Sequence, residues 1–337
     1  MATEQSAKAK AWAIFDRIVA KAAPKGVHSN PWKKREDGSL RYVPDFDTLC
    51  RLLGVPLYLK AATQSGVPAL ALDVWISYEL RRAGFDEDQT WPRAKHPRIL
   101  PAPVAKLLKK LPMDLGVSVR EFIESEGSIK GVTSSSASIL GKNYLKQVDV
   151  IITDGVTGPE LLISTKRMDS SYGKNAANRV EESYGDAKNL RLRHPLAALG
   201  FAFGLRSNIL ETDYATAEWL FDLLAKLGQE DDAYHATCLI LMKYSDSVAV
   251  VDDGEEPPET IVLEPGPEPE QGEAPVPDDD TDRAIAKLPP VSILIQETPE
   301  ILSPGRFLEI MVARMLGATP VTMHRKARER RAEAAKG

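Results

Sequence analysis

Apolar residues recur at helical spacing near the start of the chain. In residues 8–23 this stripe consists of Trp12, Phe15, Ile18 and Val19. It predicts a helix. The same spacing predicts a short helix over residues 45–53, which Gly54 would end, and a longer helix over residues 70–83. Residues 1–110 are therefore expected to form an α-helical N-terminal region, and its helix, turn and helix would suit DNA recognition as well as plain helix packing.

The pattern changes to runs of β-branched residues in the middle of the chain. Residues 146–153 and 160–166 have the composition of two strands, and the Gly and Pro residues between them indicate a turn. A polar helical segment follows over residues 175–193, and an apolar strand over residues 196–205. A helix is expected over residues 117–126, just before the hairpin.

Alternating strands and helices continue toward the C-terminus. The predicted elements are a helix over 217–227, strands over 237–243 and 291–296, and a helix over 307–316. This order indicates an α/β protein with a mixed central β-sheet flanked by helices. Residues 111–251 would form its core, and residues 286–337 would add a strand, a helix and a basic tail that pack on this core.

Acidic residues are concentrated in one segment. Residues 252–282 hold 13 Asp and Glu, no Lys or Arg, and 7 of the 24 prolines. Such a stretch cannot bury enough apolar surface to order itself, so residues 252–285 are expected to form a disordered loop. The net charge of the chain is −5, but outside residues 252–282 it carries 43 basic and 35 acidic side chains. A mildly basic folded part permits a polyanionic partner.

Several classes of protein are disfavoured by the composition. No apolar run reaches the roughly 18 residues that a membrane span needs, and the start of the chain lacks a signal-peptide pattern. Only two cysteines are present, Cys50 and Cys238, which argues against a disulfide scaffold and favours a cytoplasmic protein. The five histidines are scattered and there is no phosphate-binding loop motif, so a zinc hydrolase or an ATPase is not expected.

A charged residue interrupts the first apolar strand of the hairpin. Asp149 lies among Val148, Val150 and Ile151, and an ionised carboxylate there is costly unless it is paired or bound to a metal. Ser164 and Lys166 project to one face of the next strand because side chains alternate. If the two strands pair, Asp149 and Lys166 converge on one edge of the sheet.

These residues and their strand context resemble the PD-(D/E)XK nuclease superfamily, which includes most type II restriction endonucleases. The resemblance covers roughly residues 116–210, with the metal-binding aspartate of the family at Asp149 and its catalytic lysine at Lys166. Ser164 stands where the second acid is expected. One subgroup with Ser-x-Lys supplies that acid from the following helix, where Glu181 is our first choice. The other candidates are Glu182, Glu124 and Glu121.

The resemblance also implies roles for the individual side chains. Asp149 and Glu181 would hold Mg²⁺, with the carbonyl oxygen of Thr165 as a third ligand. Lys166 would orient the attacking water and offset charge that develops on the phosphate. Ser164 would hydrogen-bond a water on the metal.

Basic residues near these strands are candidates for DNA contact. Residues 81–110 contain eight Lys and Arg and several prolines, so we expect an extended basic connection. The expected DNA-binding residues are Arg93, Lys95, Arg98, Arg167, Lys174 and Arg179.

The function implied by the resemblance is a Mg²⁺-dependent endonuclease of restriction type that cleaves double-stranded DNA. Such enzymes are commonly homodimers, and a cognate DNA methyltransferase is a candidate partner. Two alternatives stay open. One is a non-catalytic nucleic-acid-binding protein on a degenerate nuclease fold, and the other is an interaction subunit of a defence or repair complex.

Overall fold

A computed structural model describes residues 6–126, 129, 132, 137–248 and 278–336. Within these residues a six-stranded sheet has the strand order β10-β9-β8-β7-β6-β3. The central strands β7, β8 and β9 are parallel, and the other neighbouring pairs are antiparallel. The strands are β3 (Thr90–Trp91), β6 (Val150–Asp154), β7 (Gly158–Met168), β8 (Ala198–Arg206), β9 (Ala236–Lys243) and β10 (Ser292–Ile293). The predicted α/β architecture with a mixed central sheet is confirmed.

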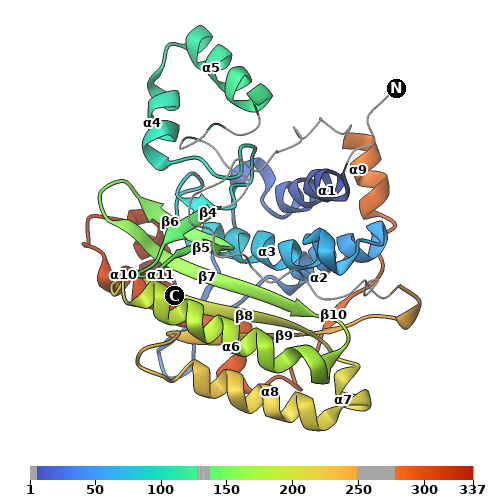
Figure 1. The fold of residues 1–337 in the computed structure, drawn as a ribbon. Coiled ribbons are helices and arrows are strands. Elements are labelled where there is room, and N and C mark those ends of the chain that lie inside the picture. The colour runs from blue at the N-terminus through green and yellow to red at the C-terminus, as the bar shows by residue number, and fades with distance from the viewer. Residues whose placement is uncertain (1–5, 127–128, 130–131, 133–136, 249–277, 337) are drawn as a thin grey trace.

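Helices cover both faces of this sheet (Figure 1). One face packs against α6 (Tyr172–Arg191) and α8 (Tyr214–Leu227), and the other against α3 (Val67–Ala83) and α10 (Pro304–Ala318). Because β7–β9 are buried on both faces, their sequences are nearly continuous apolar runs. Alternate residues of these strands therefore belong to two separate hydrophobic cores.

The N-terminal helices share one of these cores with the sheet. The core joins α1 (Ala7–Ala22), α2 (Phe46–Leu59) and α3 to apolar side chains of β6 and β7. The small hairpin β1 (Trp32–Lys34) and β2 (Leu40–Tyr42) lies beside α10 and α11 (Arg325–Lys336). The predicted basic tail is thus largely a helix that packs on the N-terminal hairpin.

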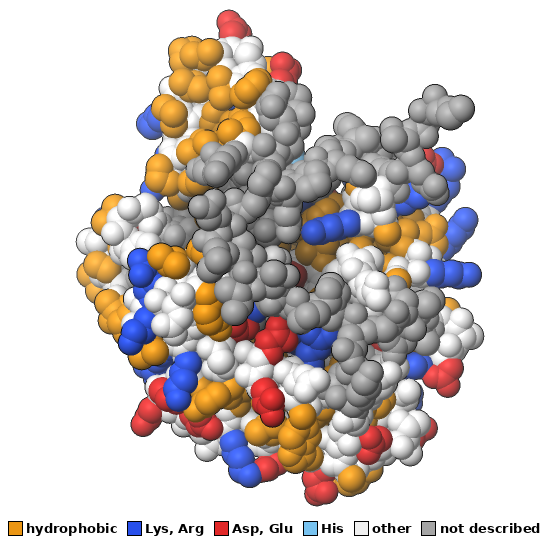
Figure 2. Space-filling view, viewed as in Figure 1, with side chains coloured by type: hydrophobic (Ala, Val, Ile, Leu, Met, Phe, Trp, Pro, Cys, Tyr) orange, Lys and Arg blue, Asp and Glu red, His pale blue; other side chains and the backbone are white. Residues whose placement is uncertain are grey.

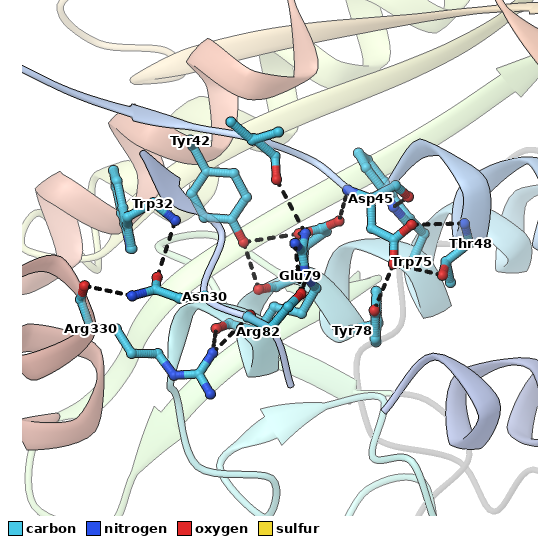
Figure 3. A network of polar contacts seen from close by, with 12 residues as sticks. Asn30, Trp32, Tyr42, Asp45, Thr48, Trp75, Tyr78, Glu79, Arg82 and Arg330 are labelled. Carbon is cyan, nitrogen blue, oxygen red and sulfur yellow. Dashed lines mark hydrogen bonds and ion pairs between the residues drawn. The ribbon is translucent and has the colours of Figure 1, made fainter. Parts of the chain in front are cut away.

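A buried polar network fixes α3 in this layer (Figure 3). Both carboxylate oxygens of Glu79, which is fully buried, accept hydrogen bonds. The Asp45 N–H donates to Oε1 at 2.7 Å, while Arg82 Nη1 and the Tyr42 hydroxyl donate to Oε2 at 2.7 and 3.0 Å. The network therefore ties α3 to the start of α2 and to β2.

Two helices project from the body of the protein (Figure 1). They are α4 (Ala102–Lys110) and α5 (Met113–Glu126), which pack on each other around Leu108 and Ile123. Apolar side chains gather on this projection (Figure 2), including the exposed Met113 and Phe122. The helix predicted over residues 117–126 is confirmed as part of α5, but it packs on α4, whereas α3 covers the sheet. Residues 102–110 are helical and not extended, since the prolines lie in the first turn, where helices tolerate them.

Two other boundaries differ from the sequence prediction. Helix α2 continues through Gly54 and Pro56 to Leu59, and Gly54 instead allows close approach of the backbone of Pro289. Residues 278–285, expected in the disordered loop, form α9 (Asp278–Ile285), where Asp282 pairs with Arg17 and Lys21 of α1 at 2.7 and 2.9 Å. The rest of the acidic segment, from residue 252 to 277, lies outside the described residues.

The predicted strand over residues 146–153 is bent at Asp149. It is divided into β5 (Leu145–Val148), which pairs with β4 (Ala137–Leu140), and β6 of the central sheet. A short helix, α7 (Ile209–Thr212), lies between β8 and α8. Among the described helices, none is both long and apolar enough to cross a membrane.

Candidate active site

The bend between β5 and β6 positions Asp149 beside the neighbouring strand. Val150 pairs with Ile163 of β7, so the chain leaves the sheet next to the Ser-x-Lys segment. The Thr165 N–H donates to Asp149 Oδ2 at 2.7 Å. This bond fixes the carboxylate to the backbone of β7, so the predicted approach of the two strands at this edge is correct.

Strand alternation separates the side chains of β7. Leu162 lies in the core on the α6 side, and Ile163 in the core on the α3 side. Ser164 and Lys166 therefore share the α6 side, and Thr165 lies toward α3. Lys166 is only 8% exposed, and its ammonium group lies 3.7 Å from Glu182 of α6.

A second carboxylate comes from α3. Thr165 Oγ1 donates a 2.5 Å hydrogen bond to Oδ1 of Asp73, which is buried on this helix. Burial and the negative charge of Asp149 raise the pKa of Asp73 well above its usual value. Ser164 leaves the second acid of the motif missing on β7, and Asp73 supplies a carboxylate from the opposite layer.

Sequence reasoning missed Asp73 because it lies about 90 residues before Lys166. One signal was available in the helix itself. Asp73 stands between Leu72 and Val74 in a helix whose residues are almost all buried, and a carboxylate in such surroundings requires compensation. Its hydrogen-bond partner on the sheet, Thr165, could be found only from the fold.

Helix α6 presents Glu182, and not Glu181, to the catalytic lysine candidate. Glu182 Oε1 lies 3.7 Å from Lys166 Nζ, and its Oε2 lies 3.8 Å from Arg179 Nη1. Glu181 is exposed. The choice of Glu181 is therefore not supported by this geometry, because the buried stripe of α6 turns the side chain of Glu182 toward the sheet.

The two remaining candidates for the missing acid lie on α5. Glu121 is exposed, and the side chain of Glu124 is outside the described residues. Helix α5 packs on α4 and projects away from the sheet (Figure 1), so Glu121 does not lie beside β7.

The carboxylates and the lysine beside β7 line a cavity of about 200 Å³. Asp73, Asp149, Thr165 and Lys166 are on its wall, and α1 contributes Lys8. Two acidic and two basic residues therefore border a space large enough for a phosphate group and several waters.

The donor set suits a hard divalent cation. No cluster of three or more His, Cys, Asp or Glu side chains of metal-binding geometry occurs in the described part of the chain. Mg²⁺, however, commonly uses one or two carboxylates and keeps its waters. Asp73 and Asp149 provide two carboxylates, and a cation between them would relieve the repulsion that raises the pKa of Asp73. The carbonyl of Thr165 remains a predicted third ligand.

Three predicted DNA contacts are used inside the protein. Arg98 is 1% exposed and pairs with Asp16 at 2.8 Å. The side chain of Arg167 is also 1% exposed and pairs with Asp169 at 2.8 Å. Arg93 is mostly buried and pairs with Asp88 at 2.7 Å. A phosphate does not reach a guanidinium that is enclosed and already paired, so these three predictions do not fit the structure.

The other three predicted contacts differ in their exposure. Lys95 is exposed and can meet a phosphate. Arg179 is half-buried beside Glu182, at the edge of the candidate site. The side chain of Lys174 lies outside the described residues.

No family model, curated protein or solved structure matches the chain. The class of protein therefore rests on the sheet, the cavity and the side chains described above.

Proposed function

We propose that the chain is a Mg²⁺-dependent endonuclease of restriction type that hydrolyses phosphodiester bonds in double-stranded DNA. One observation carries the proposal: Asp149, Lys166 and Asp73, from a strand bend, the next strand and a covering helix, line one cavity. Two acids that can hold a metal ion and a lysine that can offset charge on the phosphate suit metal-assisted phosphodiester hydrolysis.

Each side chain has a separate task in this reaction. Asp73 and Asp149 would hold Mg²⁺, which polarises a phosphate oxygen and lowers the pKa of a bound water. The ammonium of Lys166, next to Glu182 at 3.7 Å, donates to the phosphate oxygen on which negative charge develops. Ser164 would hydrogen-bond a water near the scissile bond. Following the resemblance, the products would carry 5′-phosphates, and two copies of the chain would cut a symmetric site.

Plasmid cleavage with and without Mg²⁺ tests the proposal. Lys166→Ala, Asp149→Asn and Asp73→Asn should each lower the rate at least about 100-fold, the scale of removing one positioned catalytic group. Lys142→Ala and Asp47→Asn are matched controls, because both residues are exposed and outside the cavity. They should cut like the unchanged chain.

The absence of an acid at Ser164 favours one second candidate, a DNA-binding protein without catalysis. Such a protein would bind duplex DNA with strong salt dependence but would leave the plasmid intact with Mg²⁺ or Mn²⁺. Wild-type cleavage by Lys166→Ala would reject the active site proposed here, whichever candidate is correct.

A further inference from the structure

A second cavity lies where α3 ends and α11 begins. Its volume is about 440 Å³. Gly84 ends α3 with φ +107°, and a Cβ on it would lie 2.8 Å from the backbone nitrogen of Ala327. The two helix ends are therefore in direct contact, and side chains from both of them line the cavity.

Arg81 is the main unsatisfied cation of this cavity. The residue is 5% exposed, and Nη1 donates to the Pro92 carbonyl oxygen at 3.1 Å. Its Nε is buried without a hydrogen-bond partner, and no carboxylate among the described residues forms an ion pair with it. Burial lowers its pKa to about 10. The negative charges of Asp16 and Glu87 oppose this shift without forming an ion pair with Arg81. The buried Nε–H therefore lacks an acceptor, which is costly.

His28 adds a second unused polar atom. Its Nδ1 is buried without a partner. Burial, followed by the nearby charges of Arg81, Arg330, Lys326 and Arg82, lowers its pKa to about 4. The imidazole is therefore neutral at pH 7 and can donate one ring N–H to an anion.

Three further basic residues line the cavity. Arg325 and Lys326, in the first turn of α11, are exposed and line the cavity, and the free N–H groups of a helix N-terminus favour an anion. Lys109 also lines the cavity. Its Nζ lies 2.5 Å from Oδ2 of Asp88, a residue that does not line the cavity. Two acids, Asp86 and Glu87, are present as well, so cations outnumber acids by two to one.

We propose that this cavity binds the phosphate monoester of a small molecule, with Arg81 and His28 as the buried donors and Lys326 at the mouth. A tetrahedral dianion accepts hydrogen bonds from several directions, which matches donors arriving from two helices and a loop. The volume exceeds that of a phosphate and falls in the range of small-molecule sites, so the phosphate carries a further group such as a nucleoside. The inference is independent of the proposed nuclease activity.

Calorimetric titration of the full-length chain tests this proposal with three probes. Adenosine 5′-monophosphate and inorganic phosphate should bind, whereas adenosine, which lacks the phosphate, should not. Arg81→Met should weaken binding at least about tenfold, and Lys326→Gln by a smaller factor. Lys336→Gln is the matched control on the same helix, exposed and outside the lining, and should bind like the unchanged chain.

Two outcomes would overturn the proposal. One is that neither phosphate probe binds at millimolar concentration. This includes the case in which duplex DNA alone binds and Lys326→Gln weakens that binding. The other is that Lys326→Gln, Lys336→Gln and a folded Arg81→Met all bind the phosphate probes as tightly as the unchanged chain. If Arg81→Met does not fold, His28→Ala takes its place, because His28 is less buried.

Discussion

Arg98 gives a direct test of the difference between a basic residue that binds DNA and one that holds the fold together. Its Nη1 and Nη2 donate to the two oxygens of Asp16 at 2.9 and 2.8 Å. The guanidinium also lies 3.9 Å from the ring centre of Trp12. These contacts join the segment before α4 to α1, so Arg98→Ala should destabilise the protein.

The magnitude follows from what is lost and what is regained. A charged hydrogen bond contributes about 1.5–3 kcal/mol, and a desolvated cation–π contact about 2 kcal/mol. The cost of burying the guanidinium, which disappears in the variant, offsets part of this. The side chain of Asp16 is 37% exposed and can be hydrated after the substitution. We therefore expect Arg98→Ala to lower the free energy of unfolding by about 2–4 kcal/mol, at the scale of large-to-small buried changes.

Urea unfolding followed by tryptophan fluorescence measures this loss. Arg98→Met keeps much of the packing over Trp12 and should lose only about half as much. Lys95→Ala, an exposed change in the same segment, should leave stability unaltered. DNA binding measured on folded protein should be unchanged in Arg98→Ala. If that variant keeps its stability within about 0.5 kcal/mol but loses DNA affinity, Arg98 is a phosphate contact and the structural role is wrong.

The remaining predictions concern the site and its support. Glu182→Gln should slow DNA cleavage about tenfold, since it removes the charge beside the proposed catalytic lysine, whereas Glu181→Gln should cut normally. A slower Glu181→Gln and a normal Glu182→Gln would instead support the choice made from the sequence. Ser164→Ala should keep most of the activity in the same plasmid assay, because we propose that Asp73 of α3 supplies the second acid, and complete loss would contradict this. Gly200→Ala should cost about 1–3 kcal/mol in urea unfolding, because a Cβ would lie 2.8 Å from two ring atoms of Phe307; an unchanged midpoint would show that the ring moves freely.

The sequence by itself determined the elements whose pattern is local. The apolar runs of β7–β9 and the helical stripes of α1 and α10 gave the α/β class and the mixed sheet, because side-chain periodicity reports which face of an element is buried. It also located Asp149 and Lys166, since a charged residue in an apolar strand is conspicuous wherever that strand packs. The hairpin that joins them is a short-range contact and could be inferred from the turn.

The tertiary structure alone decided every feature that depends on residues far apart in the chain. Asp73 reaches the site from α3, and Glu182 is selected over its neighbour by how α6 rotates on the sheet. Arg98 carries the same charge as Lys95, yet one is enclosed by α1 and the other is in solvent. Local sequence encodes the propensity and periodicity of an element, whereas burial and pairing are set by which elements pack together. For a charged side chain, that packing decides whether it supports the fold or is free to bind a ligand.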